Sequence, residues 1–184
     1  MTSSRRKLWI FTDWDETITS RDTLSLIAPP DGSTGAPPFR SFGEYYMTLM
    51  KDFEKKFGPR NTLERQLEFL DQLKVVEKQS VENVERRGLF KDVTREELCL
   101  RAKGVPFREG WKEFVETVQG SEHAKIVAVV SVNWSAVFIE CALKHLHGEE
   151  FLKQIEIRAN VRSVCEGEVD SRILRSEMVR RRGC

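Results

Sequence analysis

The chain has 184 residues, of which 40% are hydrophobic and 32% charged, and its formal net charge is +1. This length accommodates one domain with a substantial core, or a smaller core with an inserted segment. The composition is typical of a globular chain. The small net charge argues against a broad electrostatic surface for nucleic acid, and no apolar segment is long enough to cross a membrane. We therefore expect neither a nucleic acid nor a membrane as partner.

The cysteines and the first residues indicate a cellular compartment. The basic stretch 3–7 precedes an apolar run that is too short for a signal peptide. The cysteines have no repeated short spacing, which favours reduced thiols over a disulfide framework or a zinc site. These features predict a cytoplasmic location, with a nuclear one as the alternative. The cysteines are Cys99, Cys141, Cys165 and Cys184.

Acidic residues follow the first predicted strand. Residues 8–11 have the sequence of a buried strand, and Asp13, Asp15 and Thr17 come directly after it. Open α/β sheets place their active sites at the carboxyl ends of strands, and alternate residues of an extended backbone point the same way. One carboxylate could attack phosphorus while the other protonates the leaving oxygen, with magnesium offsetting the charge. The structural alternative is a strand that ends in a solvated acidic turn.

The middle of the chain is predicted to be helical. Apolar residues recur at helical spacing, and nothing alternates as a strand does. Residues 20–105 therefore read as a helical insertion. Its expected pieces are a helix over 42–57 that ends at Gly58-Pro59, a helix capped by Asn61 and Glu64 with the stripe Leu63, Leu67, Leu70 and Leu73, a piece over 81–90, and a helix that a Thr94–Glu97 capping box begins.

A second strand and a polar loop follow a helix with a predicted buried face of Trp111, Phe114, Val115 and Val118. Residues 125–130 form a continuous β-branched run, typical of a strand buried on both faces. Ser131 ends this strand, and Ser135 is the expected N-cap of the next helix. A hydroxyl and free N–H groups ahead of a helix form an anion site. We therefore expect Ser131 to bind phosphate, with Asn133 as a further contributor; the alternative is an ordinary turn serine.

The last part of the sequence gives weaker signals. A third strand is expected over 155–160, a small hairpin over 164–169, and a basic tail over 174–184.

The stretch Asp13-Trp14-Asp15-Glu16-Thr17 resembles motif I of the haloacid dehalogenase-like (HAD) superfamily, an apolar strand followed by Asp-x-Asp-x-Thr. The resemblance implies that Asp13 is the nucleophile and Asp15 the general acid/base. It also implies a Mg²⁺ site formed by Asp13 and the main-chain carbonyl of Asp15, and a place for Thr17 in the substrate pocket. Glu16 stands where the family often has a small residue. Ser131 fits motif II, an apolar strand that ends in Thr or Ser.

The resemblance implies an α/β, Rossmann-like core with a parallel sheet, made of 1–19 and 106–184. It implies an inserted helical C1 cap over 20–105, as in the phosphoserine phosphatase-like branch. The Arg108-Glu109-Gly110-Trp111 segment is similar to the re-entry segment of that branch. The Lys of motif III and the acids of motif IV are not recognisable. We therefore expect the last core strands to be missing and the chain to be C-terminally incomplete relative to the family.

The function that this resemblance implies is magnesium-dependent hydrolysis of a small phosphate monoester through an aspartyl-phosphate. The expected partner is a small phosphorylated substrate, whose identity the sequence does not give. Because two motifs are missing, the alternative is a truncated or degenerate, non-catalytic HAD-like protein that acts as a binding or regulatory module.

Overall fold

The computed structural model describes residues 7–159. The predicted hairpin over 164–169 and the tail over 174–184 lie outside this range. Within it, no helix is both long and apolar enough to cross a membrane. The elements are β1 (Leu8–Thr12), α1 (Leu24–Ile27), α2 (Phe39–Phe57), α3 (Leu63–Arg86), α4 (Arg95–Ala102), α5 (Trp111–Gln119), β2 (Ala124–Val130), α6 (Ala136–His147), α7 (Glu149–Leu152) and β3 (Glu156–Arg158).

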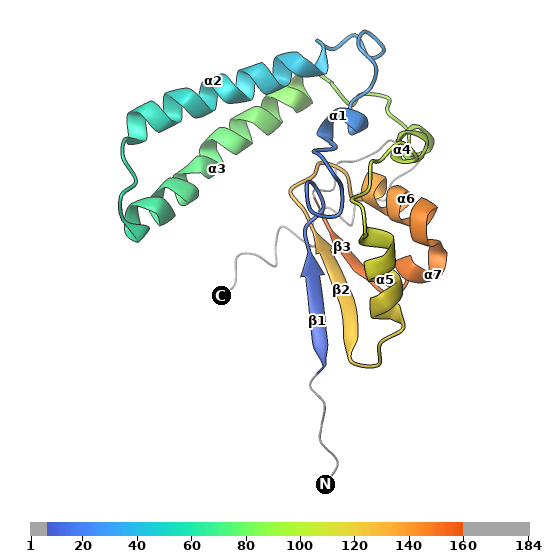
Figure 1. The fold of residues 1–184 in the computed structure, drawn as a ribbon. Helices are drawn as coiled ribbons and strands as arrows, with labels where there is room; N and C mark the ends of the chain where they lie inside the picture. Colours follow the sequence, from blue (N-terminus) through green and yellow to red (C-terminus); the bar gives the residue numbers. More distant parts are fainter. Residues whose placement is uncertain (1–6, 160–184) are drawn as a thin grey trace, which may run out of the picture. The chain divides into compact units, whose positions relative to one another are not determined.

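The described strands form one parallel sheet in the order β1-β2-β3. Thr12 pairs with Val129, and Val130 pairs with Arg158, so the carboxyl ends of all three strands lie at the same edge (Figure 1). A parallel sheet connected through helices is the mixed α/β architecture that the sequence predicted. It is consistent with a Rossmann-like fold.

The middle strand is buried and the edge strand is not. In β2, Ile126, Ala128 and Val129 are 4% exposed or less, which confirms the predicted burial for the middle of that strand, whereas Val130 at its end is 47% exposed. In β1, Trp9 and Phe11 are 65% and 62% exposed, so the prediction of a buried first strand was wrong. The physical reason is position, because β1 has one neighbour among the described strands and an edge strand is covered less than a central one.

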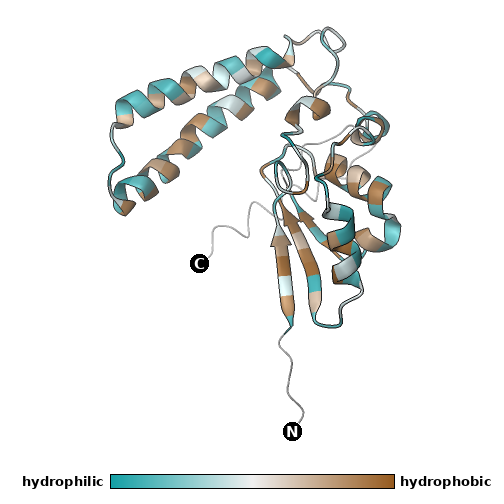
Figure 2. Ribbon diagram, viewed as in Figure 1, coloured by the Kyte–Doolittle hydropathy of each residue, from teal (hydrophilic) through white to brown (hydrophobic). Residues whose placement is uncertain are grey.

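Helices of the sheet unit supply the rest of its core. α5 contacts β2, α6 contacts β3, and α4 packs against α6. Figure 2 shows the apolar residues of these strands and of α6 in brown. Ser135 caps α6 by accepting a hydrogen bond from the Phe138 N–H, and Thr94 with Glu97 forms the capping box of α4. Both caps were predicted. Phe114, expected on the buried face of α5, is 41% exposed.

The described chain divides into two compact units at Ser20/Arg21 and Lys91/Asp92. The predicted insertion extended to residue 105, but α4 belongs to the sheet unit because it packs on α6. A disulfide between Cys99 and Cys141, with Cα atoms 5.0 Å apart, joins these two helices. The expectation of reduced thiols at these two positions was therefore wrong.

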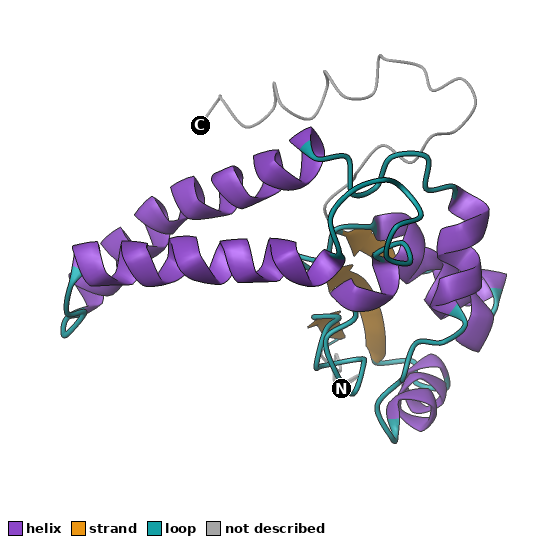
Figure 3. Cartoon of the chain, turned by 90° about the horizontal axis from the view of Figure 1, so that it is seen from above, coloured by secondary structure: helices purple, strands orange, loops and turns teal. Residues whose placement is uncertain are grey.

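The second unit contains a hairpin of the long helices α2 and α3, which run side by side in opposite directions (Figures 1 and 3). α2 ends at Gly58, as predicted, and Gly58 adopts a φ of 79°. The N-cap of α3 is Thr62, whose hydroxyl accepts from the Arg65 N–H, and not Asn61. α3 also continues without a break into the expected separate piece over 81–90 and ends within it, at Arg86.

The leucine stripe of α3 was assigned to the wrong face. Leu63, Leu67 and Leu70 are 70%, 57% and 49% exposed. The stripe that packs begins at Phe69, whose ring lies 5.0 Å from that of Phe53 on α2. Two overlapping apolar stripes occur on this helix, and the aromatic partner on α2 decides which is buried. The buried residues of α3 are Phe69, Val76, Ser80, Asn83 and Val84.

Candidate active site

The loops after β1 and β2 meet at the carboxyl edge of the sheet. Asp13 follows Thr12 directly and Ser131 follows Val130, and Thr12 pairs with Val129 in the parallel ladder. Both residues therefore leave the sheet at the same edge. The Ser131 N–H donates to the carbonyl oxygen of Arg158 at 2.8 Å, which ties the second loop to β3.

A hydrogen bond connects these two loops. The Asn133 side-chain Nδ2 donates to Asp15 Oδ2 at 2.9 Å. Asn133 is 1% exposed, and its Oδ1 accepts from the Ser135 N–H at 3.2 Å. The sequence indicated Asn133 as a phosphate contributor. In the structure its amide bonds both the Asp15 carboxylate and the start of α6, and a contact with phosphate stays a prediction.

The predicted free N–H groups ahead of α6 are partly engaged by side chains. Ser131 Oγ accepts from the Asn133 N–H at 3.0 Å, and Ser135 Oγ accepts from the Phe138 N–H at 3.1 Å. A serine hydroxyl that accepts such a bond keeps its proton for donation. Ser131 can therefore donate to an anion from a fixed position, while the amides of Asn133 and Phe138 already have partners.

The loop after β1 alternates between buried and accessible side chains. Trp14 is fully buried, and its ring packs edge-on against Phe107 with a centroid distance of 6.0 Å. Asp13 lies on the accessible side, where Thr17 Oγ1 donates to its Oδ2 at 3.3 Å. Trp14 thus anchors the loop, and the neighbouring acids face the same edge of the sheet.

Glu16 adopts a left-handed backbone conformation with a φ of 58°. This conformation costs a non-glycine residue about 1–2 kcal/mol and explains why a small residue suits the position. Thr19 Oγ1 accepts from the Glu16 N–H at 3.1 Å, and the Arg108 guanidinium binds the Glu16 carbonyl. Sequence reasoning found no site role for Arg108; its only signal was the similarity of its segment to a re-entry segment.

Magnesium was expected between Asp13 and Asp15. Carboxylate and carbonyl oxygens are the ligands that Mg²⁺ prefers, and one or two protein carboxylates with waters and a substrate phosphate complete many such sites. The donor types present therefore fit the ion. Among residues 7–159, however, no three Asp, Glu, His or Cys side chains are placed together so that they could hold a metal ion. Few fixed ligands would then hold Mg²⁺.

A cavity of about 410 Å³ lies elsewhere, at the amino-terminal edge of the sheet. Leu8, Ala124 and Phe151 are among the residues that line it. Because Asp13 and Ser131 follow the opposite ends of the same strands, this cavity is not part of the candidate site.

Comparisons with known proteins give two similarities. No family model matches the chain. The chain is 27% identical over 135 residues to a CTO1 family protein of Schizosaccharomyces pombe, a match that covers 72% of this chain and 48% of that protein. It is also similar to a solved structure of a phospho-aspartyl intermediate analogue of phosphoserine phosphatase, with 19% identity and a TM-score of 0.42, over 89% of this chain and 61% of that one. The chain thus spans about half the length of the curated relative that it matches.

Proposed function

We propose that the chain is a HAD-like phosphatase that hydrolyses a small phosphate monoester. The observation that carries this proposal is the meeting of two loops at one sheet edge. Asp13 and Ser131 follow neighbouring parallel strands there. The Asn133 side chain holds Asp15 at 2.9 Å in the same place. The resemblance of residues 13–17 to motif I supports the same chemistry.

The proposed reaction has two steps. A carboxylate oxygen of Asp13 attacks phosphorus, the bond from phosphorus to the alcohol oxygen breaks, and Asp15 gives its proton to that oxygen. Water then attacks the aspartyl-phosphate and loses a proton to Asp15. The phosphorus–oxygen bond to Asp13 breaks, which releases inorganic phosphate. The Ser131 hydroxyl donates a hydrogen bond to a phosphate oxygen throughout.

Asp13, through its carboxylate, and Asp15, through its main-chain carbonyl, would hold Mg²⁺ in this proposal. The ion would offset the repulsion between the carboxylate and the phosphate. Thr17, bonded to Asp13, keeps the carboxylate oriented at the mouth of the site. On the same proposal, the inserted unit of residues 21–91 acts as the cap that selects the substrate.

The test is turnover of p-nitrophenyl phosphate by the purified full chain with and without Mg²⁺. Asp13→Asn removes the nucleophile and should abolish turnover, because an amide oxygen is a far poorer nucleophile than a carboxylate. Asp52→Asn, the same change at an exposed position of α2, serves as the matched control and should leave the rate unchanged. Turnover that persists in Asp13→Asn would refute the proposal.

A non-catalytic binding module is the second candidate. The absence of a three-ligand acidic cluster in the described residues favours it. This function predicts that inorganic phosphate raises the melting temperature of the wild-type chain although no substrate is turned over. Loss of that protection in Ser131→Ala would then locate the anion at the same edge of the sheet.

A further inference from the structure

The chain that returns to the sheet unit pairs with the loop that follows β1. The Arg108 N–H donates to the Ile18 carbonyl at 2.9 Å, and the Ser20 N–H donates to the Pro106 carbonyl at 2.8 Å. An isolated antiparallel bridge between Thr19 and Phe107 lies between these two bonds. These main-chain contacts lie inside the sheet unit and hold Arg108 next to the loop that follows β1.

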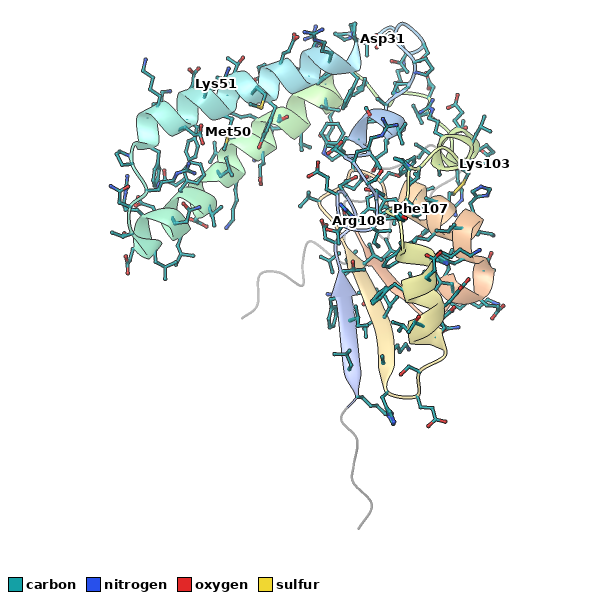
Figure 4. All side chains as sticks on the ribbon, viewed as in Figure 1. Asp31, Met50, Lys51, Lys103, Phe107 and Arg108 are labelled. Carbon is teal, nitrogen blue, oxygen red and sulfur yellow. A yellow bond between two sulfur atoms is a disulfide. The ribbon has the colours of Figure 1, made fainter. Side chains whose placement is uncertain are left out.

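The Arg108 side chain adds hydrogen bonds to the same loop, closer to the acidic residues. Its Nη2 donates to the Glu16 carbonyl at 2.5 Å and its Nε donates to the Thr17 carbonyl at 3.0 Å. Figure 4 labels Arg108 and Phe107 near the end of β1. Within the described part of the chain, the guanidinium forms these bonds to main-chain oxygens and no ion pair with a carboxylate. A planar guanidinium with donors in a fixed fork suits two adjacent carbonyls in a way that a lysine ammonium does not.

These two carbonyls belong to the part of the loop that has the unfavourable backbone conformation. Glu16 has the left-handed φ of 58°. Thr17, whose carbonyl Arg108 binds, donates its hydroxyl proton to the Asp13 carboxylate. A contact path therefore runs from Arg108 through Thr17 to Asp13 without involving the substrate. Removing the guanidinium would remove the charge-assisted hydrogen bonds to both carbonyls. The left-handed backbone conformation of Glu16 would then keep its energetic cost without these bonds to stabilise it.

We propose that Arg108 is a positioning residue that holds the Asp13–Thr17 loop in its reactive conformation. This inference rests on the proposed phosphatase function. Arg108 acts through the main chain, so the rate of the chemical step depends on it and substrate affinity does not.

The kinetic test compares Arg108→Gln, Arg108→Lys and the control Arg95→Gln. Arg95 belongs to the same unit and binds Glu140, so its substitution makes the same change of charge away from the site. With p-nitrophenyl phosphate, Arg108→Gln should lower kcat about tenfold or more at nearly unchanged KM, because it removes no ground-state contact. Arg108→Lys should restore part of the rate. A raised KM with normal kcat would overturn the proposal, since Arg108 would then be a substrate ligand.

A second measurement does not depend on turnover. The N–H groups of Ile18 and Thr19 both donate to the Trp14 carbonyl, at 3.0 and 3.1 Å, and their hydrogen exchange followed by NMR reports loop opening. Exchange should become about tenfold faster in Arg108→Gln and stay unchanged in Arg95→Gln. If Arg108→Gln does not fold, Arg108→Lys replaces it in both measurements and should show a smaller change in the same direction.

The outcomes separate the two proposals. If the wild-type chain shows no turnover but hydrogen exchange is faster in Arg108→Gln, the phosphatase function is refuted and the positioning of the loop by Arg108 still holds. Unchanged exchange in the Arg108 variants refutes the positioning role even if the wild-type chain is active.

Discussion

Asp15 and Asn133 are 118 positions apart in the sequence and share a hydrogen bond of 2.9 Å. The bond joins the loop that holds both acids to the loop that holds Ser131. Because Asn133 is 1% exposed and also accepts from the Ser135 N–H, it has little freedom to turn toward a ligand. Its effect on chemistry should therefore pass through the Asp15 carboxylate.

Asn133→Ala should test this contact at the scale of a single residue. The substitution removes the hydrogen bonds from Asn133 to the Asp15 carboxylate and from the buried Ser135 N–H to Asn133, and a buried polar group that loses its bond costs about 1–3 kcal/mol. We expect a lower melting temperature and about a tenfold lower kcat for p-nitrophenyl phosphate. Asn61→Ala, at an exposed position before α3, is the control. A normal kcat in Asn133→Ala would mean that Asp15 needs no such support.

The sequence indicated some of these residues and missed others for physical reasons. Asp13 and Ser131 could be predicted to share an edge because each follows an apolar run that reads as a parallel strand. The partner of Asn133 could not, since a single sequence carries no record of which loops touch. The left-handed Glu16 and the carbonyls bound by Arg108 depend on main-chain conformation, which the identity of these side chains does not specify.

Helices and strands were predicted best where the local signals were strong. The Thr94–Glu97 capping box and the Ser135 cap are formed within four residues, so tertiary packing does not alter them. Burial depends on what covers an element. β1 has the predicted sequence of a strand but lies at the edge of the described sheet, and α3 buries Phe69 in place of Leu67 because the aromatic residues of α2 face it.

The link between α4 and α6 gives a prediction at the scale of elements. The Cys99–Cys141 disulfide closes a segment with a sequence separation of 42, and a loop of this size stabilises a fold by about 3–4 kcal/mol in the chain-entropy model. A reducing agent should therefore lower the melting temperature of the wild-type chain by several degrees.

Cys99→Ser is the control for this measurement. Its melting temperature should equal that of the reduced wild-type chain within about 1–2 °C and should not respond to the reducing agent. A wild-type melting temperature that is equally insensitive would show that the two thiols are not bonded in solution.

The molecule as described consists of a sheet unit that carries the acids and a helical unit inserted after residue 20. This organisation followed from one observation in the sequence, the long helical stretch between two apolar strands. The boundary at residue 91 did not, because α4 is a helix like the inserted ones and only its packing on α6 assigns it to the sheet unit.

The proposed reaction depends on Asp13 forming a covalent bond to phosphorus. The most direct measurement is intact-mass spectrometry after acid quenching of the full chain during turnover of p-nitrophenyl phosphate, followed by peptide mapping. We predict a mass increase of one phosphoryl group that maps to Asp13 and is absent from Asp13→Asn. A phosphoryl group on another residue, or steady turnover with none on Asp13 at any quench time, would contradict the proposed reaction.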